Sequence, residues 1–179
     1  MIVFDASEHR LEENIAETRR TVEAILPRIL IEGEVGYVGS GSEIHERRPD
    51  NIRLTEPEEA RQFVAETNVD LLSPSVGTTH AMLFSMIRGT ERKRLDIPRI
   101  AAIKKITSVP LILHGGSGTS VEDFRKSIQA GITMIHINTK LRVAWRGGLE
   151  KRCRSGIMTG LWHRMGCCRS VVQGQDSHP

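Results

Sequence analysis

The chain has 179 residues, of which 39% are hydrophobic, 26% charged and 4% aromatic, and its formal net charge at pH 7 is +3. It contains no long unbroken apolar run, and residues 1–9 lack the basic and apolar regions of a secretory signal, so we expect neither a membrane span nor a signal peptide. Residues 151–179 carry five basic side chains and one acidic side chain, which leaves the rest of the chain with a net charge of −1. Because the excess of basic over acidic residues lies in this tail and aromatic residues are few, we expect no nucleic-acid partner.

Apolar residues before the tail follow a strand–helix alternation in chain order. The runs that predict strands are residues 1–4, 29–34, 68–75, 109–113 and 132–137, the first of them expected to be buried. The segments that predict helices are residues 11–26, 55–64, 97–106, 121–130 and 141–149, with a polar loop over 40–53. The helix over 55–64 is expected to begin with a capping box at Thr55 to Glu58.

The predicted strands are apolar on both faces and alternate with helices, which favours a parallel sheet covered by helices. This pattern fits either a doubly wound sheet or a (β/α)8 barrel. No glycine-rich dinucleotide fingerprint follows the first strand and no P-loop motif occurs, which weakens the nucleotide-binding alternative. Five strands in about 150 residues are too few for a complete barrel, so we expect a smaller sheet or part of a barrel.

Polar residues follow the predicted strands at corresponding positions, where parallel α/β folds gather their functional groups. They are Asp5, Glu34, His80, His114 and the pair Asn138-Thr139. Two imidazoles that follow different strands could supply two ligands of a zinc site. A catalytic zinc site takes three protein ligands. The alternative is that each histidine caps its strand through a hydrogen bond, and the third ligand is not evident from the sequence.

Two further features carry one chemical and one purely structural alternative each. Gly115 to Gly118 offers backbone N–H groups suited to a phosphate, or is an ordinary glycine-rich loop. Thr139 belongs to a second phosphate-binding helix start, or is a plain N-cap. Glu32 and Glu34 are interpreted as facing opposite sides of their strand, and Arg92 to Arg94 as a solvated helix face.

Seven segments, in this order and at these spacings, carry a family resemblance: residues 4–7, 12–15, 32–36, 55–60, 76–80, 113–118 and 135–139. Through them residues 1–148 resemble the class II, zinc-dependent fructose-bisphosphate aldolases and their tagatose-bisphosphate relatives. The resemblance implies the last five strands of a (β/α)8 barrel. It also implies reversible aldol cleavage of fructose 1,6-bisphosphate, or tagatose 1,6-bisphosphate, to dihydroxyacetone phosphate and glyceraldehyde 3-phosphate. In this chemistry zinc polarises the ketone and stabilises an enediolate.

The resemblance also implies roles for particular residues. His80 and His114 are expected to bind the catalytic zinc, and Asp5 and Glu34 to match carboxylates of a second metal position. Residues expected to bind the sugar phosphate are Ala81, Gly115, Gly116, Ser117, His136, Ile137, Asn138 and Thr139. The cofactor is Zn2+, with a second divalent metal and a monovalent cation left open.

Three departures from the family pattern bear on activity. The Asp-His pair of the preceding strand has no counterpart, so no catalytic acid is assigned and the family's aspartate is placed upstream of Met1. Ala81 stands where the family has glycine, and His136 where it has asparagine. The resemblance ends near Glu150, so we divide the chain into an aldolase part over residues 1–150 and a non-homologous, disordered tail over residues 151–179.

These observations lead to expectations about partners and place of action. The partner is a small sugar bisphosphate or dihydroxyacetone phosphate, with a homo-oligomer left open. All three cysteines lie in the tail, which is compatible with a reducing, cytoplasmic compartment. The alternatives are a non-catalytic aldolase remnant or a fragment that acts only with a complementing partner chain, and a phosphate-binding barrel fragment of another enzyme family.

Overall fold

The computed structural model describes residues 1–25, 29–39, 41, 43–47 and 51–154. The chain divides after Thr139 into two units, and the second is described from Lys140 to Arg154. Of the tail expected over 151–179, residues 155–179 lie outside the described residues, as does Leu26 at the end of the first predicted helix. The division of the chain at residue 150 stays a prediction.

The first unit is built on a five-stranded parallel sheet in the order β1-β2-β4-β6-β7. Its strands are β1 (Ile2–Phe4), β2 (Ile31–Val35), β4 (Leu71–Pro74), β6 (Leu111–Leu113) and β7 (Ile132–Ile135). The strands lie in the sheet in the order in which they occur along the chain, and a helix connects each strand to the next. The expected fold class, an α/β chain containing part of a (β/α)8 barrel, is confirmed by this topology and by the structural matches given below.

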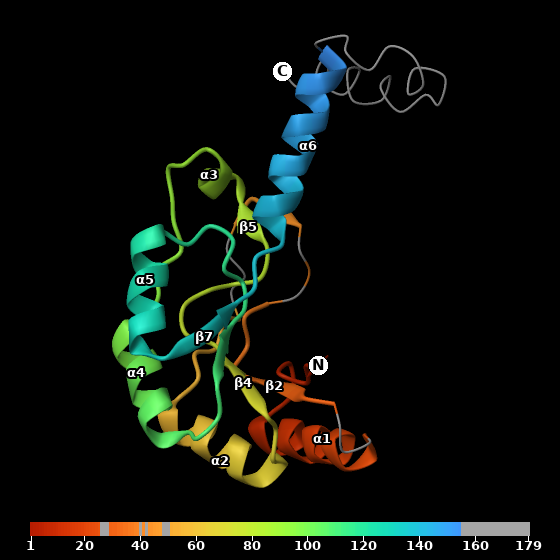
Figure 1. The fold of residues 1–179 in the computed structure, drawn as a ribbon, viewed down its shortest axis with the longest axis vertical. Coiled ribbons are helices and arrows are strands. Elements are labelled where there is room, and N and C mark those ends of the chain that lie inside the picture. The colour runs from red at the N-terminus through yellow and green to blue at the C-terminus, as the bar shows by residue number, and fades with distance from the viewer. Residues whose placement is uncertain (26–28, 40, 42, 48–50, 155–179) are drawn as a thin grey trace. The chain divides into compact units, whose positions relative to one another are not determined.

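Four helices cover one side of the sheet, each packed on the next (Figure 1). They are α1 (Leu11–Ala24), α2 (Pro57–Thr67), α4 (Ile97–Ile106) and α5 (Val121–Ala130). The core between the helices and the sheet centres on Phe63, Leu72, Ile100, Ile103 and Leu111, all of them fully buried. Since the helices and strands share this core, the carboxyl ends of the strands are held at one end of the layer.

Shorter elements follow the strands. β3 (Ile44–His45) pairs in parallel with β5 (Met82–Leu83), and α3 (Phe84–Ile87) follows β5 directly. The sequence predicted none of these three elements. The helix α6 (Thr139–Arg154) begins at Thr139, the last residue of the first unit, and makes up the described part of the second unit. Thr139 is thus the first residue of this helix rather than the residue before it, where an N-cap was expected.

Two further expectations about the fold are wrong. β1 is not buried: Ile2 is 38% and Val3 43% exposed, because in the described part of the chain this strand pairs with β2 alone. Helix α2 is capped by Glu56 rather than Thr55, through a capping box with Glu59. Thr55 instead donates from Oγ1 to the carbonyl of Val35 at 2.6 Å and accepts from the Ser75 N–H, and so joins the ends of β2 and β4.

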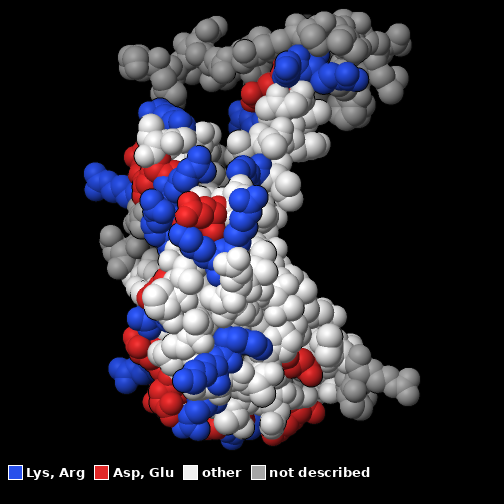
Figure 2. Space-filling view, turned by 60° about the vertical axis from the view of Figure 1, so that its left-hand side comes forward, with Lys and Arg blue, Asp and Glu red and all other residues white. Residues whose placement is uncertain are grey.

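The surface shown in Figure 2 carries basic and acidic side chains side by side, with uncharged surface between the groups. Among the described helices, none combines the length and apolar character needed to span a bilayer.

Candidate metal and phosphate site

The inner face of β2 carries two carboxylates. Glu32 and Glu34 are both buried, and both lie within 2.7 Å of the His114 imidazole. The expectation that they face opposite sides of the strand is therefore wrong. Side chains two residues apart lie on the same face of a strand, and it is Gly33 between them that faces the helices. A Cβ on Gly33 would lie 2.7 Å from the Phe63 ring, so the helix layer leaves no room for a side chain there.

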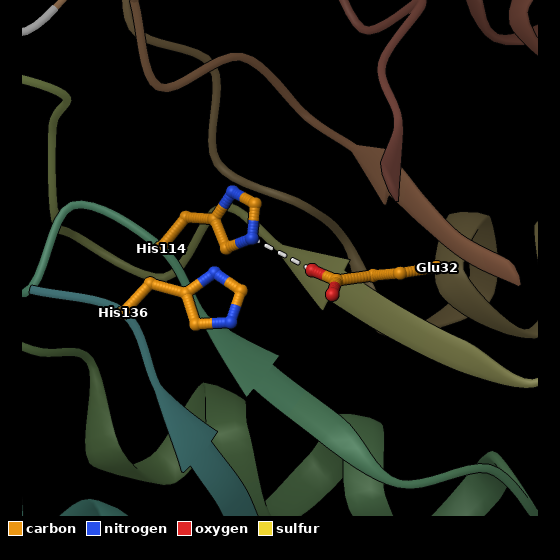
Figure 3. Close-up of side chains that lie close together, drawn as sticks. All are labelled: Glu32, His114 and His136. Atoms are coloured by element: carbon orange, nitrogen blue, oxygen red, sulfur yellow. Dashed lines mark ion pairs between the residues drawn. The ribbon is translucent and has the colours of Figure 1, made fainter. Parts of the chain in front are cut away.

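His114 directly follows β6 and lies between these carboxylates. Its Nε2 is 2.7 Å from Glu32 Oε1 and its Nδ1 is 2.7 Å from Glu34 Oε1. Figure 3 shows Glu32 reaching toward this ring, with the His136 ring beside it. Burial alone would lower the pKa of His114, but its close contacts with the carboxylates of Glu32 and Glu34 outweigh burial and raise the pKa to about 9. Without a metal, His114 is therefore a protonated imidazolium at neutral pH.

His80 lies in the loop after β4, and its ring centroid is 5.8 Å from that of His114. Burial lowers the pKa of His80, and the neighbouring imidazolium of His114 lowers it further, against the opposing charge of Glu34. His80 is thus held as a neutral imidazole, which is the form that binds metals. Its backbone N–H donates to the carbonyl of Val38 at 2.7 Å, which fixes the loop against the chain that follows β2.

Glu34, His80 and His114 form a group that could hold a metal ion, since their ligand atoms lie within 4.8 Å of one another. Two imidazole nitrogens and one carboxylate oxygen match the ligand sets of catalytic zinc sites, which leave a fourth position open. A second group of the same kind consists of Glu32, His114 and His136. Among the described residues, Asp5 joins neither group; its Oδ1 accepts the N–H of Ser7.

Glu32 tests whether these residues suit a metal. Its carboxylate is completely buried, and neither of its oxygens has a hydrogen-bond partner among the described residues; Oε1 is in ion-pair contact with His114. Burial of a carboxylate is costly unless positive charge compensates it. With His114 Nδ1 on the metal, an Nε2–H facing Glu32 would provide the carboxylate–histidine–metal arrangement common in metal sites. The set of ligand atoms and the buried Glu32 carboxylate both fit a divalent ion.

A pocket of about 470 Å³ opens beside this group. The residues lining it are Glu34, Gly41, His80, Ala81, His114, Gly115, Ser117, His136, Ile137, Asn138 and Thr139. The structure thus brings together every residue expected to bind metal or sugar phosphate except Asp5 and Gly116. Gly116 lies directly behind the wall, where its N–H donates to the His136 carbonyl at 3.1 Å.

The glycine turn after β6 requires its glycine. Gly115 has φ +64°, and a Cβ there would lie 2.3 Å from the carbonyl oxygen of Thr79. This close approach of two backbones presses the turn against the loop that carries His80. Ala81, which stands where the family has glycine, strains the backbone. It adopts φ +64°, a conformation that glycine adopts without strain.

Two further residues contact the group that could hold a metal, here called the metal-capable group (Glu34, His80 and His114). Asn14 of α1 is fully buried and donates from Nδ2 to the Glu34 carbonyl at 2.9 Å, while its Oδ1 accepts from Thr18. His136 stacks against His114 with ring centroids 4.6 Å apart. The family's asparagine position is thus occupied here by a third imidazole within reach of Glu32.

The expectation that Arg92 to Arg94 form a solvated helix face is wrong at its central residue. Lys93 is only 2% exposed and lies outside any helix, in the segment between α3 and α4. Its ammonium donates to the carbonyls of Thr79, Ala81 and Gly115, behind the pocket. Lys93 and Glu32 are site residues that sequence reasoning missed. Because residues two apart lie on the same face of a strand, the sequence could have placed Glu32 beside Glu34. No pattern in the sequence around Lys93 indicates that it is buried.

Comparison with known proteins identifies the family. A model of the family described as fructose-bisphosphate aldolase class-II matches residues 1–168. The chain belongs to this family. The match continues past Glu150, where the resemblance read from the sequence was expected to end.

Individual aldolases agree with this assignment. The chain is 35% identical over 145 residues to the 6-phospho-5-dehydro-2-deoxy-D-gluconate aldolase of Shouchella clausii, a match covering 80% of this chain and 46% of that protein. The crystal structure of the YdjI aldolase from Escherichia coli K12 matches with a TM-score of 0.64 and 28% identity, over 86% of this chain and 49% of that one. A chain from Coccidioides immitis with a provisional fructose-1,6-bisphosphate aldolase assignment matches with a TM-score of 0.67 and 28% identity, over 89% and 53%. The chain thus spans about half the length of these relatives.

Proposed function

We propose that this chain carries the metal- and phosphate-binding part of a class II ketose-bisphosphate aldolase site. The reaction would be reversible aldol cleavage of fructose 1,6-bisphosphate or tagatose 1,6-bisphosphate to dihydroxyacetone phosphate and glyceraldehyde 3-phosphate. The observation that carries the proposal is the convergence of Glu34, His80 and His114 beside the Gly115 turn in one pocket. Membership of the aldolase family supports it.

Glu34, His80 and His114 would hold the Zn2+, and Asp5 remains a candidate for a second metal position. When bound, the metal would act as a Lewis acid on the ketone oxygen of the substrate. The chain's own contribution is to present one neutral imidazole, His80, and to exchange the proton of His114 for the metal. Glu32 would then accept a hydrogen bond from the other ring nitrogen of His114 and keep the ring oriented.

The phosphate would be bound by the turns after β6 and β7. Gly115 and Ser117 line the pocket from the first turn, and Asn138 and Thr139 line it from the second, where α6 begins. Backbone N–H groups and hydroxyls at such turns suit an anion with several acceptor oxygens. His136 would contact the ketone end of the substrate, because it lies between the phosphate turn and His114.

The substrate of the Shouchella clausii relative is a phosphorylated keto acid rather than a sugar bisphosphate. A substrate of that class is therefore a second candidate for this site. The two classes share one phosphate and a ketone, and differ in the group that lies beyond the bond to be cleaved. The pocket residues described above would contact the phosphate and the ketone that both substrate classes share, and so do not distinguish the two classes.

The isolated chain is expected to bind metal but to show negligible aldolase turnover. The sequence shows no counterpart of the family's Asp-His pair, and the chain spans about half the length of its relatives. A complementing chain that supplies the remaining strands would restore activity, which is the alternative of a fragment that acts with a partner. The partner could be a second copy or a separate polypeptide.

Metal binding is the direct test. The full chain would be titrated with Co2+, a spectroscopic substitute for Zn2+, and binding followed through visible absorption. Wild type should bind one equivalent, which Zn2+ displaces, while His80→Ala and His114→Ala should lose the spectrum. His9→Ala is the matched control, since His9 is exposed and pairs with Glu13 and Glu17 outside the pocket. Loss in His9→Ala, or an unchanged spectrum in His80→Ala, would contradict the proposed ligand set.

A coupled assay for triose phosphate tests the catalytic part of the proposal. Each substrate class would be supplied to the zinc-loaded chain alone and with a polypeptide comprising the missing strands of a relative. Turnover by the mixture but not by either component would support the fragment proposal. Full turnover by the chain alone would refute the expectation that it lacks an essential group.

A further inference from the structure

A buried ammonium group lies behind the pocket, where the strand-end loops meet. Lys93 Nζ donates to the carbonyl of Ala81 at 2.7 Å and to that of Gly115 at 2.9 Å, and it also donates to the carbonyl of Thr79. The backbone N–H of Lys93 in turn donates to the Gly118 carbonyl at 3.1 Å. Both ends of the residue are therefore fixed against the chain around the pocket.

The number and type of these contacts match a charged lysine. An ammonium has three N–H donors and no acceptor, and here three carbonyl oxygens receive them. A cluster of backbone carbonyls is also the surrounding that a dehydrated potassium ion finds in proteins, because the oxygens replace its water. The three oxygens thus offer a site for a monovalent cation, and the side chain of Lys93 occupies it.

The same peptide groups are fixed on their other side. The N–H groups that follow these carbonyls belong to His80, Met82 and Gly116, and they donate to Val38, Glu43 and His136 at 2.7, 3.3 and 3.1 Å. In a planar peptide the C=O and the next N–H point in opposite directions. A cation that draws the three carbonyls together therefore also directs these N–H groups toward the loops after β2 and β7.

We propose that Lys93 is a tethered monovalent cation that positions His80 and the Gly115 turn, so that the site needs no free potassium or sodium ion. Lys93 lies outside the pocket wall and acts through the backbone on both sides of His80. It is a positioning residue rather than a catalytic one. The inference rests on the proposed function only in calling His80 and the Gly115 turn working parts of a site; the cation itself is tested without zinc or sugar phosphate.

The wild-type arm of the test compares thermal unfolding in potassium chloride, ammonium chloride and tetramethylammonium chloride at equal ionic strength. A free-cation site would admit the first two ions and exclude the bulky third. With Lys93 in place, the melting temperature should be the same in all three salts within the scatter of replicate measurements. A saturable rise in potassium or ammonium over tetramethylammonium would overturn the proposal, because it would show that the oxygens take a free ion.

Two substitutions separate the charge from the space it fills. Lys93→Ala leaves room for an ion, and Lys93→Met fills that room with an uncharged chain. Both should lower the melting temperature in tetramethylammonium chloride by about 5 °C or more, since three buried carbonyls lose their partner. Potassium or ammonium should restore at least half of the loss in Lys93→Ala, saturably, and none of it in Lys93→Met.

Lys104→Ala is the matched control, because Lys104 also donates to a backbone carbonyl, that of Val109, at 3.1 Å, but away from the pocket. Its melting temperature should show no preference among the three salts. If Lys93→Ala is too unstable to melt, refolding from urea replaces the measurement: refolding in potassium alone supports the proposal, and refolding in no salt overturns it. Equal stability of wild type and Lys93→Ala in all salts would overturn it as well.

Co2+ titration of Lys93→Ala links the cation to the metal-capable group. Metal affinity should be lower in tetramethylammonium chloride than in potassium chloride for this variant, and equal in both for wild type. If the chain proves to bind no transition metal at all, the proposed function fails at that point. The salt dependence of unfolding still decides the role of Lys93, so the two failures are distinguishable.

Discussion

The Oε1 atom of Glu32 lies 2.7 Å from Nε2 of His114, across the sheet from β2 to the end of β6. Glu32 is completely buried and His114 is only 8% exposed, so solvent screens this pair very little. The other ring nitrogen faces Glu34 at the same distance. One imidazole thus connects two carboxylates of a single strand, and its protonation and orientation depend on both.

Glu32→Gln tests whether the carboxylate supports a metal ligand from behind. An amide keeps the volume but removes the charge that orients the His114 ring, so metal affinity should fall by about 10–100-fold without loss of stoichiometry. Competition with a chromophoric chelator measures this change. Glu12→Gln, on the exposed surface of α1, should leave the affinity unaltered. An unchanged affinity in Glu32→Gln would show that this pair plays no part in metal binding.

The pH dependence of stability follows from His114. Its pKa is raised in the folded chain from 6.5 to about 9, so protonation stabilises the fold. This contribution is fully present below about pH 6.5 and is lost as the pH rises through 9. In metal-free chain, the free energy of unfolding from urea titrations should therefore decline between these values. His114→Asn should remove this decline, and an equally steep decline in that variant would assign it to other groups.

Gly115→Ala should destabilise the chain and distort the pocket. The new Cβ would lie 2.3 Å from the Thr79 carbonyl oxygen, and the residue would be forced to keep φ +64°. We expect a loss of about 2 kcal/mol or more in the free energy of unfolding. Gly147→Ala, in α6, is the control: a Cβ there meets nothing within 4 Å, and alanine favours a helix by up to about 1 kcal/mol. Similar losses in both variants would contradict this account.

Ala81→Gly should stabilise the chain. Ala81 adopts φ +64°, where a Cβ costs about 1–2 kcal/mol that glycine avoids, partly offset by the greater freedom of glycine in the unfolded chain. The net gain should be about 1 kcal/mol, measured by urea unfolding. Asn68→Gly makes a matched comparison, because Asn68 also has positive φ, at the end of α2, but asparagine tolerates this conformation better. A larger gain at Asn68 than at Ala81 would count against strain at Ala81.

Much of the helix and sheet arrangement could be predicted because its signals are local. The helices α4 and α5 begin and end at the predicted residues, where the side chains of Asp96 and Ser120 cap an amphipathic segment. Parallel pairing followed from strands that are apolar on both faces. β3 and β5 could not be predicted, since two-residue strands have no period, and their pairing joins segments far apart in the chain.

The site was predictable where residues follow a strand and not where they depend on distant partners. Glu34 is near the end of β2, His114 directly follows β6, and His80 lies in the loop after β4, so one topological rule brought them together. Glu32 was misplaced because the period of a strand was applied wrongly. Lys93 was assigned to the surface because its sequence neighbours are arginines, while the carbonyls that it contacts lie 12 to 22 residues away.

The paired carboxylates on β2 give the folding of this chain a requirement for positive charge. Two anionic groups in a dry interior must be matched by a proton on His114 or by a divalent ion. Anything that binds the native chain but not the unfolded one increases the folded fraction by mass action. Chelators in a growth medium should therefore lower the yield of intact protein and make it more sensitive to proteases, before any catalytic property is measured.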